Sequence, residues 1–234
     1  MGLLTTTELI QEVRGNLLNR TDVTDGEIIN ALNFAQEEIS RVHDFRELQA
    51  FFTVNTQFTS SAFNDKFVPL NNLVKHIHTA VLLTGDTASR KLAEKPWRMF
   101  DRLFPAPEVI ARSRPVIYSR WNQNLILYPV PDAVYAIFMR TTNWPSTLSV
   151  VSGTQVSDYD HKDEVIIGMA SGHLWGKRGR YDKRKFFLDE ANFLLDTSIK
   201  QDNDRPDMDV DIDLAGIGQV GNYWVDPFVK GMPM

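Results

Sequence analysis

The stretch TDGEIINALNFAQEEISRV, residues 24–42, starts with a capping box and continues with a regular apolar spacing. In such a box the Thr24 hydroxyl accepts a hydrogen bond from the amide of Glu27, while the Glu27 carboxylate accepts one from the amide of Thr24. Apolar residues then recur at intervals of 4, 3, 4 and 3, namely Ile28, Leu32, Ala35, Ile39 and Val42. The pattern predicts an amphipathic helix whose narrow apolar seam packs beside another helix.

Upstream of this helix the sequence predicts a partner for it. A second capping box, Thr5-Thr-Thr-Glu8, precedes apolar residues at helical spacing. These are Leu9, Ile10, Val13 and Leu17. The connector Asn19–Val23 is short, so the two helices should form an antiparallel hairpin.

Helical spacing returns near residue 158. Four carboxylates in or just before a first turn oppose the positive end of a helix dipole, and apolar residues follow them. The carboxylates are Asp158, Asp160, Asp163 and Glu164, and the next positions are Val165, Ile166, Met169, Ala170 and His173. Gly176 and Gly179 serve as stop signals around a basic turn, Lys177–Lys185, before a last helix. That helix carries Leu188, Ala191, Leu195 and Ile199.

The region between the two helix pairs is rich in β-branched and aromatic residues bounded by Asn, Asp, Gly or Pro, which predicts strands. The expected strands are 50–56, 67–70, 74–83, 115–121, 125–128 and 134–142. Residues 96–104 predict a short helix with Pro96 at its first position. Pro129 and Pro131 cannot donate to a β ladder. They are therefore interpreted as a stiff hairpin connector that joins the last two strands.

The element order predicts an α+β fold, because two amphipathic helix pairs are buried most economically against each other. We expect a four-helix core formed by N-terminal and C-terminal helix pairs, an inserted antiparallel β lobe and an extended C-terminal arm. The expected units are a helical hairpin (1–46), the β-rich lobe with one short helix (47–150), the closing helix pair (151–200) and the arm (201–234).

The expected arm alternates acidic and apolar residues, so an extended chain would have one polar and one apolar face. Its aspartates are Asp207, Asp209, Asp211 and Asp213, and its later aromatic residues include Tyr223, Trp224 and Phe228. Such a segment has little core of its own and is a candidate for ordering on a partner. The basic turn carries Lys177, Arg178, Arg180, Lys183 and Arg184. It could complement the aspartates of a neighbouring copy or another acidic surface.

Composition and motifs exclude several function classes. The 234 residues carry a net charge of −5, which disfavours broad nonspecific binding to nucleic acid. The absence of cysteine excludes disulfides, thiolate metal sites and thiol catalysis. No P-loop or dinucleotide-binding glycine motif occurs, and no apolar run approaches the roughly 18 residues that span a bilayer. We therefore expect no catalytic residue, no cofactor, no bound metal and no membrane contact.

The weaker chemical signals have simpler interpretations. His76 and His78 would lie on one side of a strand, but a zinc site needs further ligands. The aspartate run fails the spacing of a calcium-binding EF-hand loop. A glycosidase needs two carboxylates across a cleft, whereas Glu37–Glu38 and Asp163–Glu164 are neighbours on helices and are interpreted as solvated or dipole-compensating charges.

Four parts of the chain carry a resemblance to a known family. The helix patterns TTTELIQEVR (5–14) and IINALNFAQEEISR (28–41), the strand pair around LILYPVPDAVY (125–135) and the closing helix pair resemble head-to-tail adaptor proteins of tailed bacteriophages, also called tail accessory, head-completion or neck connector proteins. The resemblance covers roughly residues 5–200. The loop from Trp144 to Ser157 departs from it, because it is richer in Ser, Val and Thr than the acidic, proline-dense segment of that family.

This resemblance implies a virion protein of the neck, assembled in the host cytoplasm. It implies a ring, commonly of twelve copies, that docks beneath the portal protein through the C-terminal arm and meets the tail or a nozzle or terminator protein. DNA would pass through its channel without sequence-specific binding. The expected protein contacts are the basic turn, the arm and the two prolines, Pro129 and Pro131. The alternatives are a cell-wall (peptidoglycan) hydrolase component of a phage tail and a sugar- or surface-binding module that uses the aromatic β lobe.

Overall fold

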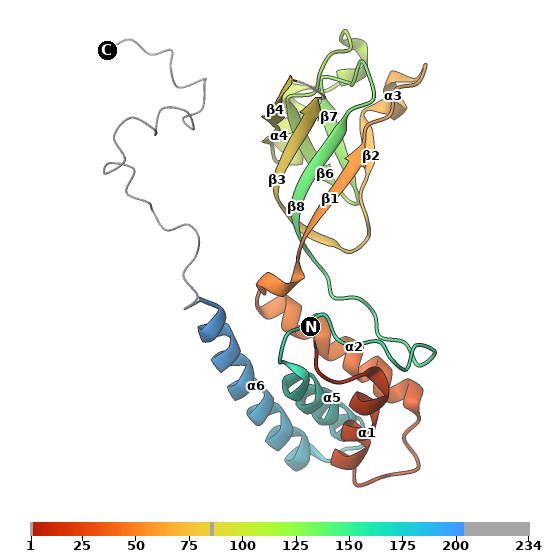
Figure 1. Ribbon diagram of the computed structural model, residues 1–234, viewed down its shortest axis with the longest axis vertical. Coiled ribbons are helices and arrows are strands. Elements are labelled where there is room, and N and C mark those ends of the chain that lie inside the picture. The colour runs from red at the N-terminus through yellow and green to blue at the C-terminus, as the bar shows by residue number, and fades with distance from the viewer. Residues whose placement is uncertain (1, 85–86, 204–234) are drawn as a thin grey trace, which may run out of the picture.

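The computed structural model describes residues 2–84 and 87–203 and shows an elongated α+β molecule (Figure 1). Four helices gather at one end, and eight strands with two short helices form the other. The first group is α1 (Thr6–Asn16), α2 (Asp25–Val42), α5 (Asp163–Lys177) and α6 (Tyr181–Asn203). The short helices are α3 (Ala62–Asp65) and α4 (Trp97–Leu103). Single 3-10 turns are η1 (Arg46–Leu48) and η2 (Pro107–Val109).

Both predicted capping boxes are confirmed. Thr5 caps α1 and Thr24 caps α2, and in each box the glutamate three residues later closes the reciprocal hydrogen bond. The apolar seam of α2 is confirmed from Ile28 to Ile39, since Ile28, Leu32, Ala35 and Ile39 have no exposed surface. Val42, expected to continue the seam, is instead 58% exposed. Local capping and periodicity were therefore sufficient to define these two helices.

One hydrophobic cluster takes side chains from α1, α2, α5 and α6, with α5 flanked by the other three (Figure 1). Three glycines of α5, spaced four residues apart, face α6. A Cβ on Gly168 would lie 3.0 Å from Ala191 Cβ, and a Cβ on Gly172 would lie 2.9 Å from Leu188 Cγ. A Cβ on Gly176 would lie 2.8 Å from Arg184 Cδ. The sequence interpretation of Gly176 as a stop signal was wrong, because it lies inside α5 and allows α6 to approach closely.

The strands form two four-stranded sheets of order β1-β8-β3-β4 and β2-β7-β6-β5. Their bounds are β1 (Gln49–Asn55), β2 (Phe67–Pro69), β3 (Val74–Thr84), β4 (Thr87–Lys91), β5 (Ala93–Glu94), β6 (Ile117–Trp121), β7 (Asn124–Tyr128) and β8 (Ala136–Asn143). A second hydrophobic cluster combines residues of both sheets, including Leu125 and Leu127 of one with Ile137 and Met139 of the other. Each pair is spaced by two, as expected for strands with one buried face.

The hairpin predicted around Pro129 and Pro131 is wrong. β7 pairs with β2 and β6, whereas β8 pairs with β1 and β3, so the connector passes from one sheet to the other. Pro131 and Val130 are buried, Pro129 is half-buried, and the Tyr128–Pro129 peptide is cis. The prolines still end β7, but period-two patterns on adjacent runs do not reveal whether the two strands pair with each other.

Several other expectations needed correction. The β region is not purely antiparallel, because β5 pairs with β6 in parallel. β4 and β5 were not predicted. The basic stretch is not one turn, since α6 starts at Tyr181, and α6 ends at Asn203 rather than at Lys200. Pro96 occupies the N-cap of α4 rather than its first helical position.

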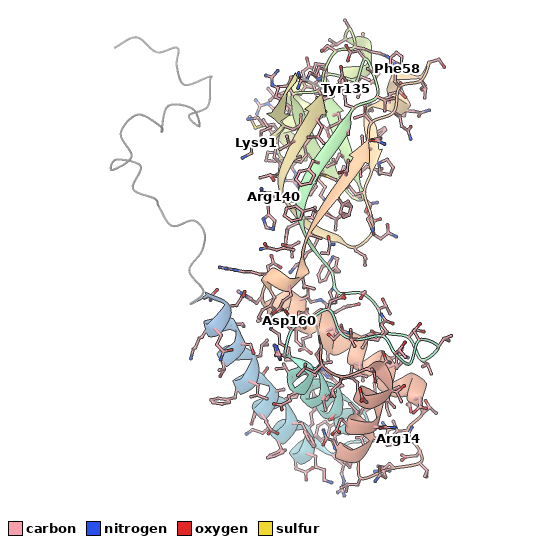
Figure 2. The ribbon with its side chains drawn as sticks, viewed as in Figure 1. Arg14, Phe58, Lys91, Tyr135, Arg140 and Asp160 are labelled. Atoms are coloured by element: carbon pink, nitrogen blue, oxygen red, sulfur yellow. The ribbon has the colours of Figure 1, made fainter. Side chains whose placement is uncertain are left out.

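Polar contacts join the helical end to the β end. Lys162, at the N-cap of α5, donates to both carboxylate oxygens of Glu47 in η1 at 2.6 and 2.8 Å, and also to the Asp160 carbonyl. Figure 2 shows Asp160 at this junction. Lys75 of β3 pairs with Asp44 at 2.5 Å, just beyond α2. These contacts fix the direction in which the chain leaves the helices.

Asp65 anchors a loop in the β end and supports a prediction about pH. Its carboxylate is fully buried, accepts hydrogen bonds from the amide and hydroxyl of Thr59 at 2.7 Å each, and lies 2.9 Å from Arg112 Nη1. Burial acts to raise the pKa of Asp65, but the Thr59 hydrogen bonds and the Arg112 charge together outweigh it and hold the pKa below its ordinary value of 3.8.

A lowered folded-state pKa means that the ionised Asp65 stabilises the fold above the unfolded-state pKa, and that this stability is lost as pH falls through the folded-state pKa. We expect Asp65→Asn to lower the free energy of unfolding by about 1–3 kcal/mol at pH 7 and to lose less further stability than wild type below about pH 4. Urea titrations at a series of pH values check this. Parallel pH profiles for the two proteins would contradict it.

Candidate protein-interaction site

The five basic residues expected to form one contact surface are divided by the fold. Gly179, with φ of +70°, closes the α5–α6 turn, and Arg180 is exposed beside it. Lys177 is exposed at the end of α5. The remaining three, Arg178, Lys183 and Arg184, have side chains that contact other parts of the protein.

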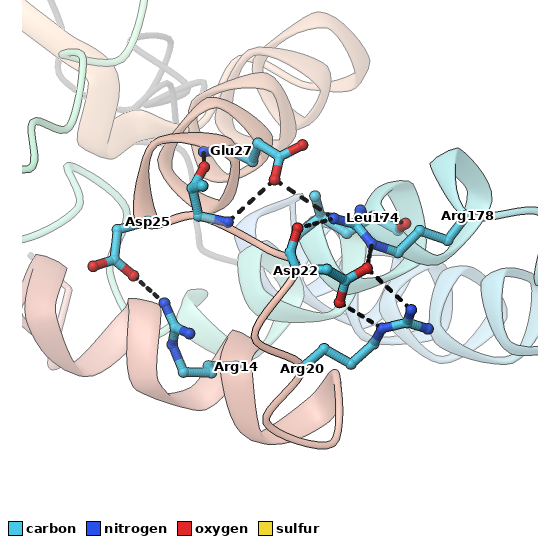
Figure 3. A network of polar contacts seen from close by, with 8 residues as sticks. Arg14, Arg20, Asp22, Asp25, Glu27, Leu174 and Arg178 are labelled. Atoms are coloured by element: carbon cyan, nitrogen blue, oxygen red, sulfur yellow. Dashed lines mark hydrogen bonds and ion pairs between the residues drawn. The ribbon is translucent and has the colours of Figure 1, made fainter.

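Arg178 is occupied within the helical end (Figure 3). Its guanidinium lies 3.4 Å from the Asp22 carboxylate and 3.5 Å from that of Glu27, and it also donates to the carbonyls of Asp22 and Leu174. Its side chain is only 14% exposed. Arg20 binds the same Asp22 carboxylate through two nitrogens. Arg178 therefore ties the α1–α2 connector to α5, which leaves it little surface to offer a partner.

Lys183 and Arg184 lie in the first turn of α6 and project toward α5. The Lys183 ammonium lies 4.1 Å from the centre of the Trp175 ring, a cation–π contact. Arg184 lies across Gly176, where its aliphatic stem takes the space that a Cβ would fill. Arg184 also lines a groove between α2 and α6.

A groove of about 490 Å³ runs between α2 and α6 above α5. We call it the α2–α6 groove, and it is lined by Asn30, Ala31, Phe34, His173, Gly176, Lys177 and Arg184. Phe34 packs edge-on against the His173 ring, with centroids 4.9 Å apart, and His173 Nε2 lies 2.8 Å from a Glu38 oxygen. Phe34 is nevertheless 46% exposed. The groove thus combines an apolar floor with cationic side chains at one end.

Sequence reasoning missed the second face of α6. Phe186 and Phe193, seven residues apart and so on one side of the helix, are 63% and 71% exposed, and Tyr181 is exposed nearby. These aromatic residues lie off the seam formed by Leu188, Ala191 and Leu195. Their seven-residue spacing was the signal that could have identified them, because a helix with two apolar faces is typical of one packed on both sides.

The β end also exposes aromatic residues. Trp97 of α4 and Trp121 of β6 form an edge-on pair with centroids 4.6 Å apart, and both border a pocket of about 280 Å³. Pro129 and Pro131 offer little surface, since Pro131 is buried. They support this end from within.

The two histidines considered as metal ligands, His76 and His78, contact other side chains of the protein. His76 lies 3.7 Å from Asp44, and His78 Nε2 lies 2.7 Å from the Thr142 hydroxyl. Within residues 2–84 and 87–203, no group of three or more His, Asp or Glu side chains is placed to hold a metal ion. Over the same residues, no helix is both long and apolar enough to cross a bilayer.

The carboxylate neighbours divide between different partners. Glu37 pairs with Arg41 and Glu38 with His173. Asp163 lies in the first turn of α5, where a dipole-compensating charge was expected, but it is buried rather than solvated and accepts hydrogen bonds from the amides of Leu3 and Leu4 at 2.7 and 2.9 Å. It tethers the N-terminal residues to α5.

The expected contacts of the arm lie outside the described residues. They are Asp207, Asp209, Asp211, Asp213, Tyr223, Trp224 and Phe228.

Comparison with known proteins adds one match. Residues 4–193 match the family model described as SU10 adaptor protein. A search of curated proteins found no match. The matched range starts just before the Thr5 capping box and ends within α6, so it includes both ends of the molecule and the α2–α6 groove.

Proposed function

The chain belongs to the SU10 adaptor protein family, and from this premise we propose that it is a structural head-to-tail adaptor of a tailed bacteriophage. In this proposal, about twelve copies of the chain form a ring between the portal protein and the tail. The ring lines a channel for DNA and belongs to the neck of the virion, after assembly in the host cytoplasm.

The observation that carries the proposal is the exposed aromatic face of α6. A helix that buries Ala191 and Leu195 on one side and exposes Phe186 and Phe193 on the other has apolar surface for a further partner. In a ring each subunit contacts one neighbour through one surface and the other neighbour through a second, complementary surface, so the α6 face would supply one side of every subunit contact. The family supports a structural role, which agrees with this use of the helix.

The two ends of the molecule suit different neighbours. The C-terminal arm follows α6 and carries Tyr223, Trp224 and Phe228, the kind of side chains that anchor protein interfaces. We assign these residues to the portal contact. The β end, with its exposed Trp97 and Trp121, then faces the tail or a nozzle or terminator protein.

The direct test is the mass of the protein alone and after mixing with its portal protein, measured by light scattering or native mass spectrometry. We expect a shift to the mass of a ring of about twelve copies bound to the portal. A chain that stays monomeric and unbound in the mixture would reject the adaptor role.

A variant pair tests the α6 face. Phe186→Asp with Phe193→Asp places two charges at the expected contact and should weaken ring formation about tenfold or more, because a buried unpaired charge is costly. The matched control, Asn192→Asp with Asn203→Asp, adds the same two charges at exposed positions of α6 that lie about a quarter turn or more away from Phe186 and Phe193, and should assemble as wild type. Equal assembly of both pairs would exclude this face from the ring contact.

A further inference from the structure

We propose that the α2–α6 groove binds the aspartate segment of a second copy, residues 207–214, in extended form. The inference rests on the proposed ring and names one of its contacts. It assigns the acidic part of the arm to a neighbouring subunit and leaves the later aromatic residues for the portal protein.

The groove offers both kinds of surface that this segment needs. Phe34, 46% exposed, supplies apolar surface, while Lys177 and Arg184 supply positive charge at the same opening. Two further basic residues of the same stretch contact the protein itself, since Arg178 binds Asp22 and Lys183 lies over Trp175. Lys177 and Arg184, with the exposed Arg180 in the turn beside them, therefore place positive charge at this end of the groove.

The aspartate segment has the matching pattern. Asp207, Asp209, Asp211 and Asp213 alternate with Met208, Val210, Ile212 and Leu214. In an extended chain, residues two apart lie about 6.6–6.8 Å from each other on the same face. One face therefore presents a row of carboxylates and the other a row of apolar side chains. A groove with an apolar floor and a cationic rim can contact both rows at once.

The length of the chain favours a second copy over the same chain. From Arg184, α6 continues about 28 Å to Asn203 at 1.5 Å per residue. Residues 204–207 extended reach at most about 14 Å beyond that end. Asp207 therefore cannot return to its own Arg184, and only the later part of the segment could reach it. The groove of a neighbouring subunit is not restricted by this chain length, so all four aspartates can lie near it.

The absence of cysteine from the chain permits a clean cross-linking test. One variant carries Asn30→Cys, at an exposed position of the groove, and the other carries Ile212→Cys. The two full-length proteins are mixed under mild oxidation, alone and with portal protein. We expect a disulfide-linked dimer that contains both variants. Val109→Cys, at an exposed position in the β end, replaces Asn30→Cys as the control and should cross-link at least about tenfold less.

Charge reversal tests the electrostatic part. Lys177→Glu with Arg184→Glu should reduce the Asn30–Ile212 cross-link about tenfold, because like charges would then face each other. Adding Asp209→Lys and Asp211→Lys to the partner chain should restore it. The matched control reverses two other exposed charges, Lys91→Glu in β4 and Lys200→Glu near the far end of α6, and should leave the yield unchanged.

Each other outcome rejects the inference. A chain carrying both cysteines that cross-links only within itself would place the segment on its own subunit. Cross-linking of Ile212→Cys to the portal protein by a photoreactive reagent attached to that cysteine, with no disulfide to Asn30→Cys, would assign the segment to the portal. Yields no higher than with Val109→Cys, in both free and portal-bound protein, would remove the contact altogether. In the last two cases a ring-sized mass with portal would still uphold the proposed adaptor function, so the two failures can be told apart.

Discussion

Lys162→Met is expected to lower the free energy of unfolding by about 3–5 kcal/mol, the largest loss of any single change considered. Lys162 and Glu47 have side chains only 7% and 10% exposed, and the ammonium contacts both oxygens of the carboxylate at 2.6 and 2.8 Å. Removing the lysine leaves a buried carboxylate without its countercharge. The midpoint of urea unfolding, followed by circular dichroism at 222 nm, measures the loss.

The double variant Lys162→Met/Glu47→Leu separates the charge from its burial. Because both charges are then absent, no charged group has to be desolvated on folding, and we expect the double variant to recover most of the stability lost in Lys162→Met. Arg41→Met supplies the control. It breaks an i,i+4 pair with Glu37 in which both side chains are more than half exposed, and should change stability by less than about 1 kcal/mol. A loss in Lys162→Met no larger than that of Arg41→Met would show that the buried pair contributes little.

Gly172→Leu is expected to cost about 3 kcal/mol or more, because the helices α5 and α6 would have to separate. Even a Cβ on Gly172 would lie 2.9 Å from both Cγ and Cδ2 of Leu188, and the Arg184 carbonyl lies 3.4 Å away. The displaced α6 would also widen the α2–α6 groove, so the Asn30–Ile212 cross-link should fall in the same variant. Thermal unfolding and the cross-link yield are the two measurements.

Gly15→Ala is the matched control for this variant. Gly15 also lies in a helix, α1, but a Cβ there would meet no atom within 4 Å. The gain in helix propensity of about 1 kcal/mol should then appear without a steric penalty. If Gly172→Leu were as stable as wild type, close approach of α5 and α6 at this glycine would not be required for the fold.

The short-range features of the chain were predictable from the sequence. Both capping boxes, the seam of α2 and the short helix at Trp97–Leu103 depend on residues within about one or two turns of each other, and the structure confirms them. The strands 67–69 and 124–128 were also found close to their expected bounds, because alternation of apolar residues is a local property.

Pairing and packing were not predictable in this way. Pro129–Pro131 connects two sheets rather than two strands of a hairpin, since strand partners are chosen by the whole β end. The role of Gly176 became visible only when α6 was placed beside α5. The sequence also could not show which basic residues of 177–185 contact the protein itself and which are exposed to a partner, because those contacts, such as Arg178 with Asp22, join residues far apart in the chain.

The sequence alone therefore determined the order of the four long helices and of most strands, the two capped helix starts and the acidic–apolar alternation of residues 207–214, but not α3, β4 or β5. These depend on neighbours along the chain. Only the tertiary structure decided that Arg178 is held by Asp22, that Lys177 and Arg184 meet Phe34 in one groove, and that Phe186 and Phe193 remain exposed. Burial and contact between distant residues depend on which surfaces the packed helices cover, and no local pattern encodes that choice.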